Sequence, residues 1–215
     1  MMRRNHSTRL MILGVLLLLA AGAWSYDNIR MEEEGKEFSQ DALVQIEQVL
    51  PDLEEKTETL LTAAKEPGQT ALLAAQAESD VIQTRQTQTI QAEGTSFIGV
   101  IQVPSLSIKL PVQANWSAYK LRRSPCRFWG SLEENTLIIA GHSTEAHFRS
   151  LRGIQLGADV VFTDAVGNTI LYQVSAIEIL GPGEGEKLAA GEWDLTLFTC
   201  SPGAEGRVTV RCTRV

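Results

Sequence analysis

The sequence of 215 residues has few cysteines, few histidines and no excess of positive charge. Its three cysteines, Cys126, Cys200 and Cys212, cannot form the dense disulfide framework of small secreted domains. The formal net charge of −7 argues against a nucleic-acid partner, because such proteins carry a basic patch or stripe. A composition of 44% hydrophobic and 21% charged residues is instead typical of a globular protein. The length suits one ordinary domain with accessory segments.

One long apolar run lies near the amino terminus. Residues 10–24 carry no charge, arginines precede them, and acidic residues follow between residues 27 and 37. This charge asymmetry places the amino terminus in the cytoplasm and the rest of the chain outside the cell. We interpret residues 1–26 as a short basic segment and a transmembrane signal anchor, so the protein is expected in the cell membrane with a single pass. A removable signal peptide ending near residues 21–23 is the alternative.

The next segment, residues 27–95, is rich in Glu, Gln, Thr and Ala and has leucines at helical spacings. Pro51 and the Pro67-Gly68 pair interrupt it, which predicts two or three helical pieces. We expect a stalk that holds the following domain away from the bilayer. A helical dimerisation segment is the alternative, but no heptad pattern persists along this segment.

From residue 96 onward the sequence is rich in short β-type segments. Residues 117–123 and 147–152 are expected to form short helices, and residues 159–163 and 169–180 to form a hairpin. About eight short strands predict a mostly β domain, folded as a single closed barrel over residues 96–215. The expected strands cover residues 98–103, 107–112, 136–140, 159–163, 169–180, 195–200 and 207–215.

An odd number of cysteines in an exported protein leaves at least one thiol unpaired, and an unpaired thiol is a candidate nucleophile. Cys200 ends a predicted strand and precedes a Ser-Pro-Gly turn, so its thiol is expected at the barrel rim. An extracellular partner imidazole must come from His142 or His147, because His6 is cytoplasmic or removed. His142 has the same setting as Cys200, since it follows the predicted strand at 136–140.

Arg207 opens the last predicted strand. Side chains alternate along a strand, so Val208, Val210 and Cys212 share the core face and Arg207 lies on the outer face. The tight turn before it should bring Arg207 beside Cys200.

Four segments resemble motifs of the sortase family, in the order that the family has them. The resemblance covers residues 97–215 and leaves out the expected stalk. The matching segments are Ile-Gly-Val-Ile-Gln-Val-Pro (98–104), Leu-Ile-Ile-Ala-Gly-His-Ser (137–143), Thr-Leu-Phe-Thr-Cys (196–200) and Arg-Val-Thr-Val-Arg (207–211).

The resemblance implies an eight-stranded sortase barrel and a cysteine transpeptidase without cofactor or metal. Cys200 would attack the Thr–Gly bond of a Leu-Pro-x-Thr-Gly-like sorting signal on a secreted protein, forming a thioacyl enzyme. His142 would move protons and Arg207 would stabilise the oxyanion, before an amine from a cell-wall precursor or a pilin accepts the acyl group. Thr199 is expected to orient Arg207 or contact substrate, and Trp193 to contact substrate.

The sequence departs from some members of the family. The loop at residues 181–193 is too short for the long helix of class B enzymes, and there is neither a carboxy-terminal membrane segment nor an obvious lid motif of class C. The resemblance is therefore to class D or housekeeping types. The spacing between Cys200 and Arg207 (207 − 200 = 7) is short, which leaves Arg211 as an alternative to Arg207.

Other polar residues have plainer interpretations. Cys126 and Cys212 are expected to be small buried side chains, with a disulfide between them as the alternative. His147 is expected at the surface, and Arg211 is expected to be a surface ion-pair partner or a support for Arg207. The acidic loop residues Glu184 and Glu186 are expected to be solvated rather than bound to calcium, which usually takes about 6–8 oxygen ligands.

Two rival functions remain at this point. One is another cell-wall cysteine transpeptidase, such as an L,D-transpeptidase, but these enzymes place the nucleophile in a His-Gly-Cys-like cluster that Cys200 lacks. The other is a non-catalytic, membrane-tethered binding barrel, which would have no use for Cys200, His142 and Arg207 together.

Overall fold

The structure is a computed structural model that describes residues 4–64, 88–201 and 205–215. The chain divides into two compact units, Met1–Glu34 and Gly35–Val215. The first unit consists, in its described part, of the beginning of helix α1 (Arg4–Val49). This part is long and apolar enough to cross a membrane, and its apolar window is not buried by protein. It is therefore a candidate membrane helix, as the apolar run at residues 10–24 predicts.

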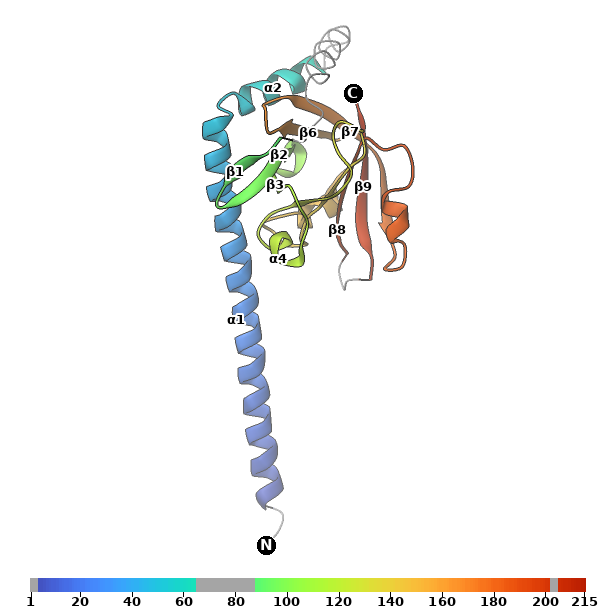
Figure 1. Cartoon of the computed structure of the whole chain (residues 1–215). Helices are drawn as coiled ribbons and strands as arrows, with labels where there is room; N and C mark the ends of the chain where they lie inside the picture. The colour runs from blue at the N-terminus through green and yellow to red at the C-terminus, as the bar shows by residue number, and fades with distance from the viewer. Residues whose placement is uncertain (1–3, 65–87, 202–204) are drawn as a thin grey trace. The chain divides into compact units, whose positions relative to one another are not determined.

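The second unit contains a β-barrel, drawn in green to red in Figure 1. The described strands form one sheet in the order β1-β2-β3-β4-β5-β8-β9-β7-β6, and β2 also pairs with β6. Strands β2 to β9 therefore close into an eight-stranded barrel, and β1 is a short addition to β2. This confirms the predicted fold. The strands are β1 (Ile90–Ala92), β2 (Thr95–Val103), β3 (Ile108–Gln113), β4 (Cys126–Trp129), β5 (Leu137–Ala140), β6 (Asp159–Asp164), β7 (Thr169–Leu180), β8 (Leu195–Cys200) and β9 (Arg207–Arg214).

Short helices connect the strands. The predicted helical segments appear as α4 (Ala118–Leu121) and the 3-10 turn η2 (Arg149–Gly153). Two further 3-10 turns, η1 (Pro104–Leu106) and η3 (Gly185–Leu188), precede β3 and β8. Strand β4 was not predicted, because it is only four residues long, contains a bulge and exposes both Phe128 and Trp129.

Alternate side chains of the strands fill the barrel interior. Leu195 and Leu197 of β8 face inward with their partners Cys212 and Val210 of β9. Residues directly opposite each other on antiparallel strands have their side chains on the same face. The intervening residues of both strands therefore lie on the outer face. This face carries Cys200 and Arg207.

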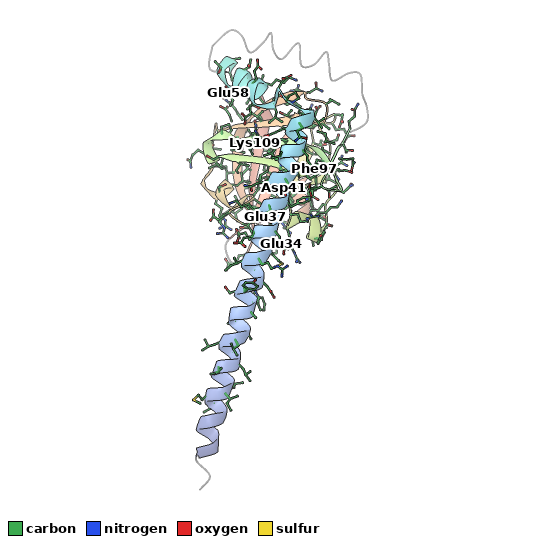
Figure 2. All side chains as sticks on the ribbon, turned by 90° about the vertical axis from the view of Figure 1, so that its left-hand side faces the viewer. Glu34, Glu37, Asp41, Glu58, Phe97 and Lys109 are labelled. Carbon is green, nitrogen blue, oxygen red and sulfur yellow. The ribbon has the colours of Figure 1, made fainter. Side chains whose placement is uncertain are left out.

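The second part of α1 packs against the barrel. Its apolar side chains and Leu53 of helix α2 (Leu53–Ala63) cover the outer face of β1 and β2, where each large buried apolar side chain contributes about 1.5–3 kcal/mol. Figure 2 shows this part of α1 lying across the barrel beside Phe97 and Lys109. The buried residues of this cluster are Phe38, Ala42, Ile46, Leu53, Ile90, Ala92, Phe97 and Val100.

Specific contacts fix this packing. The Ser39 hydroxyl donates to the Arg123 carbonyl at 3.0 Å, and the Arg123 guanidinium lies 3.6 Å from the centroid of the Phe38 ring. A Cβ on Gly35 would lie only 2.4 Å from the Arg122 carbonyl oxygen, so this close approach requires glycine.

The compact unit that contains the barrel begins at Gly35 and includes the second part of α1 and helix α2. The helical break at Pro51 is as predicted, because α1 ends at Val49 and α2 begins at Leu53. The predicted break at Pro67-Gly68 lies outside the described residues.

Candidate functional site

Strands β5 and β8 run parallel and bring two sequence motifs together. Their register pairs Ala140 with Phe198, and the Gly141 amide donates to the Phe198 carbonyl at 3.0 Å. His142 lies two residues after Ala140, and Cys200 lies two residues after Phe198. Neighbouring strands are about 4.8 Å apart. The register therefore leads the imidazole and the thiol to equivalent positions at the same end of the barrel.

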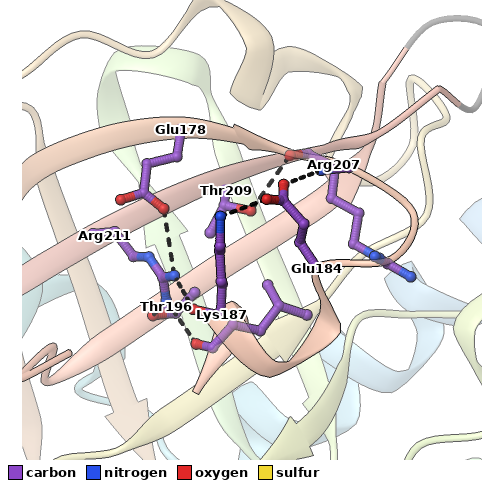
Figure 3. Close-up of polar contacts among 9 residues, drawn as sticks. Glu178, Glu184, Lys187, Thr196, Arg207, Thr209 and Arg211 are labelled. Carbon is purple, nitrogen blue, oxygen red and sulfur yellow. Dashed lines mark hydrogen bonds and ion pairs between the residues drawn. The ribbon is translucent and has the colours of Figure 1, made fainter. Parts of the chain in front are cut away.

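Strands β8 and β9 add a guanidinium to this end. Cys200 and Arg207 are direct partners in the antiparallel register, so both side chains lie on the outer face of the barrel. The Arg207 Nη1 atom is buried and has no hydrogen-bond partner within the described ranges. Figure 3 shows the Arg207 side chain directed away from the polar contacts of Arg211. This donor is not engaged by another described residue, and a movement of the guanidinium would expose it to a ligand on this face.

The three cysteines differ sharply in accessibility. Cys200 is exposed, whereas Cys126 and Cys212 are buried, and all three are free thiols. Burial raises the pKa of both buried thiols to about 12, so they stay protonated at neutral pH. The simpler interpretation of Cys126 and Cys212 is confirmed, and the alternative of a disulfide between them is not.

An apolar surface adjoins Cys200 on the outer face. Phe198 packs there with Ile138 and Ala140 of β5, and its ring meets that of Phe128 in an edge-to-face contact with centroids 5.2 Å apart. Phe128 in turn contacts the Trp116 ring at 5.8 Å, and both of these aromatic side chains are exposed. Phe198, Ile138 and Ala140 are themselves buried, so Phe128 and Trp116 form the exposed part of this apolar surface, which can bind a peptide side chain near the accessible thiol.

Arg211 lies on the same face as Arg207 but is completely covered. Only 2% of it is exposed, so the expectation of a surface position is wrong, but it does form an ion pair, with the Glu178 carboxylate at 3.4 Å. Its guanidinium donates to the carbonyl oxygens of Leu188 at 2.6 Å and Lys187 at 2.5 Å, and to the Thr196 hydroxyl at 3.1 Å (Figure 3). The η3 turn thus packs over this part of the outer face, and Arg211 holds it there.

His147 is also buried, contrary to the expected surface position. It is 2% exposed, and neither ring nitrogen has a hydrogen-bond partner in the part of the chain that the structure describes. Burial lowers the pKa of His147 to about 4, and the charge of His142 adds to this effect. His147 is therefore neutral at pH 7. His147 is buried because the next residue, Phe148, packs its ring against Gly141. This contact is so close that a Cβ on Gly141 would lie 2.2 Å from the ring.

Two other predicted residues do not meet the thiol. Thr199 is 1% exposed and pairs with Val208, so its side chain lies on the opposite face of β8 from Cys200 and Arg207. Its hydroxyl has no hydrogen-bond partner among the described residues, Arg207 included. Trp193 precedes the other end of β8, and the five steps from Leu195 to Cys200 alone span about 17 Å.

One residue at the site was missed by the sequence analysis. Arg152 of η2 donates through Nη2 to the carbonyl oxygen of Cys200 at 3.1 Å and to the hydroxyl of Ser143, the residue after His142. No sequence pattern marks this contact, because it joins positions far apart in the chain.

Comparison with protein families identifies the chain. The model described as the Sortase domain matches residues 101–215, a little over half of the sequence. The chain belongs to the sortase family. Sortases are cysteine transpeptidases, so this member is an enzyme of the sortase type, and its subclass is not specified by the match. Comparison with curated proteins found no match.

Solved sortase structures have the same fold. Sortase A from Corynebacterium diphtheriae is 20% identical with a TM-score of 0.52, over 91% of this chain and 95% of that one. Sortase C-1 from Actinomyces oris is 21% identical with a TM-score of 0.51, over 66% and 94%. Sortase C1 from Streptococcus agalactiae is 22% identical with a TM-score of 0.51, over 70% and 91%. At these identities the likeness concerns the fold alone.

Proposed function

We propose that this sortase cleaves a sorting signal similar to Leu-Pro-x-Thr-Gly between Thr and Gly and transfers the acyl group to an amine. Cys200 is the nucleophile, His142 the proton-transfer residue and Arg207 the oxyanion stabiliser. The observation that carries the proposal is the strand register, which brings residues from β8, β9 and the end of β5 to one rim of the barrel.

In the first step the Cys200 thiolate attacks the carbonyl carbon of the threonine and forms a C–S bond. The carbonyl oxygen becomes an oxyanion, which accepts a hydrogen bond from the Arg207 guanidinium. One well-placed donor of this kind typically contributes about 3 kcal/mol to transition-state stabilisation. The C–N bond to glycine then breaks, and the imidazolium of His142 gives its proton to the leaving amine.

In the second step an incoming amine attacks the thioacyl carbon. His142 accepts the proton of the amine, the C–S bond breaks, and the Cys200 thiolate is regenerated. The accepting amine belongs to a cell-wall precursor or a pilin subunit. The half-buried position of Arg207, whose Nη1 is unengaged within the described residues, supports its role in both steps.

The apolar surface beside Cys200 supports a substrate with apolar residues ahead of the cleaved bond. Phe198 precedes Cys200 by two residues on the same face, and Phe128 and Trp116 extend the surface. The leucine and proline of the sorting signal pack there. The candidate membrane helix supports anchoring in the cell membrane, with the barrel and its secreted substrates outside the cell.

A peptide-cleavage assay tests the proposal. The full-length protein in detergent is incubated with a quenched Leu-Pro-x-Thr-Gly peptide library, and mass spectrometry follows the products and the adduct on Cys200. We expect cleavage after threonine and a thioacyl adduct, and neither in Cys200→Ala. A protein that binds peptides without forming an adduct would instead be a binding barrel.

A further inference from the structure

We infer that Arg152 is a positioning residue that holds the Cys200 strand beside the imidazole loop, an inference that rests on the proposed roles of Cys200 and His142. A single nitrogen of Arg152, Nη2, bonds to the carbonyl oxygen of Cys200 and to the hydroxyl of Ser143. Ser143 directly follows His142 in the chain. One guanidinium therefore joins the backbone of the nucleophile to the neighbour of the imidazole.

The pairing between β5 and β8 ends before it reaches the two proposed catalytic side chains, so a further contact is needed to hold Cys200 on this side. The register of β5 and β8 ends at Ala140 and Phe198, and the Gly141 amide adds a bond to Phe198. The two reacting side chains lie beyond these pairs. Arg152 extends the connection between the two chains to Cys200 itself, on the side of β8 that faces β5. On the other side, pairing with Arg207 of β9 already holds Cys200.

The backbone of Arg152 is held in place by its neighbours, although its side chain is exposed. Its neighbour Leu151 is fully buried in the barrel core, and the Leu151 amide donates to the Phe148 carbonyl at 3.1 Å. Phe148 is also fully buried and packs against Gly141, the residue before His142. The guanidinium therefore extends from a rigid support that also carries the imidazole loop.

A nearby arginine makes a different set of contacts. Arg149, on the same 3-10 turn, pairs with the Glu145 carboxylate at 2.9 Å and donates to the Ser143 carbonyl at 3.3 Å. Both of these contacts stay within residues 143–149, whereas Arg152 also reaches the nucleophile strand. Arg149 is thus a matched control for the loss of an arginine from this turn.

The expected effect is on the chemical step. A charge-assisted hydrogen bond to the Cys200 carbonyl restrains the backbone that carries the thiol, and reaction rates depend steeply on the distance between reacting groups. Solvent weakens the restraint because Arg152 is exposed. We expect Arg152→Ala to lower kcat about tenfold, equivalent to about 1.4 kcal/mol, and to leave KM within about twofold.

The test compares Arg152→Ala, Arg152→Lys and Arg149→Ala in the full-length protein in detergent, with a Thr-Gly peptide that the wild type cleaves. We expect a fall in kcat for Arg152→Ala, partial rescue by Arg152→Lys, which keeps one donor, and a change below about twofold for Arg149→Ala. Thermal unfolding midpoints should match in all variants, which separates positioning from folding.

Several outcomes would overturn the inference. Wild-type kcat in Arg152→Ala would do so, as would an equal fall in Arg149→Ala or a rise in KM alone. These outcomes leave the proposed function intact, because the wild type still cleaves the peptide. If the wild type forms no thioacyl adduct with any peptide, the proposed function fails and the inference fails with it.

Discussion

Replacing Arg211 and replacing Arg207 should have opposite consequences, although both arginines lie on the same face of β9. Removing the buried Arg211 side chain leaves the carbonyl oxygens of Lys187 and Leu188 without their donor. Each unsatisfied buried group costs about 1–3 kcal/mol, and loss of the ion pair with Glu178, which is 40% exposed, adds less than about 1 kcal/mol. Water can reach part of the emptied site, so we expect Arg211→Ala to lower the free energy of unfolding by about 3 kcal/mol.

Arg207→Ala should instead act on the reaction. The side chain is half-buried and its Nη1 makes no hydrogen bond within the described residues, so its removal should change stability by no more than about 0.5 kcal/mol. Loss of an oxyanion donor should lower kcat about 10²–10³-fold. Urea unfolding followed by circular dichroism gives the stabilities, and steady-state peptide cleavage gives the rates.

One pair of results would refute this reasoning. If Arg211→Ala had wild-type stability and no activity, while Arg207→Ala remained active, the oxyanion role would belong to Arg211. Arg211→Lys adds a control, because it keeps the charge but loses the forked geometry that serves several acceptors at once. It should recover only part of the stability.

Three further predictions concern burial. In the native protein iodoacetamide should alkylate Cys200 alone, and Cys126 and Cys212 should react only after unfolding, as peptide mass mapping would reveal. The free energy of unfolding should fall by up to about 3 kcal/mol as the pH drops from 6.5 towards 4. The reason is that His147 binds a proton in the unfolded chain over this range, whereas its pKa of about 4 keeps it neutral in the folded protein. Urea titrations across this range measure the fall. Phe38→Ala should reduce stability by about 3 kcal/mol in the same titrations, since the ring is 5% exposed and packs on the barrel.

Each of these has its own control. Alkylation of Cys126 before unfolding would contradict its buried position. His147→Leu should flatten the pH dependence, and an unchanged profile would assign it to other groups. Val44, on the same helix as Phe38, is 54% exposed, so Val44→Ala should have little effect. Equal destabilisation by the two helix variants would argue against docking of α1.

The barrel and the rim positions of Cys200 and Arg207 could be predicted because they follow from local rules. Period-two alternation fixes the face of every residue in β8 and β9 once one core residue is assigned. The same rule placed Arg211 correctly on the outer face. It could not tell that η3 would cover that face and bury the guanidinium, because this depends on a loop twenty or more residues away.

The docking of α1 and the burial of His147 were out of reach for a related reason. Phe38, Ala42 and Ile46 are spaced at helical intervals, but nothing local states that their partner is the outer face of β2. The sequence predicts a short helix at residues 147–152 with His147 at the surface, and its burial comes from Phe148 and Leu151, which pack into the core. The local sequence pattern predicts the face on which a side chain lies. Its packing partners depend on tertiary contacts that the local pattern does not contain.

Cys200 and Arg207 are direct partners in the strand pairing, so their relative position does not depend on the length of the hairpin that joins them. Arg207 is paired with Leu180 of β7 as well as with Cys200, so extra residues inserted into the hairpin should loop outward without changing this pairing. Doubling the length of a flexible connection adds only about 0.6 kcal/mol of closure entropy. The short spacing between Cys200 and Arg207 is therefore a property of the loop, and the strand pairing keeps the two residues opposite each other.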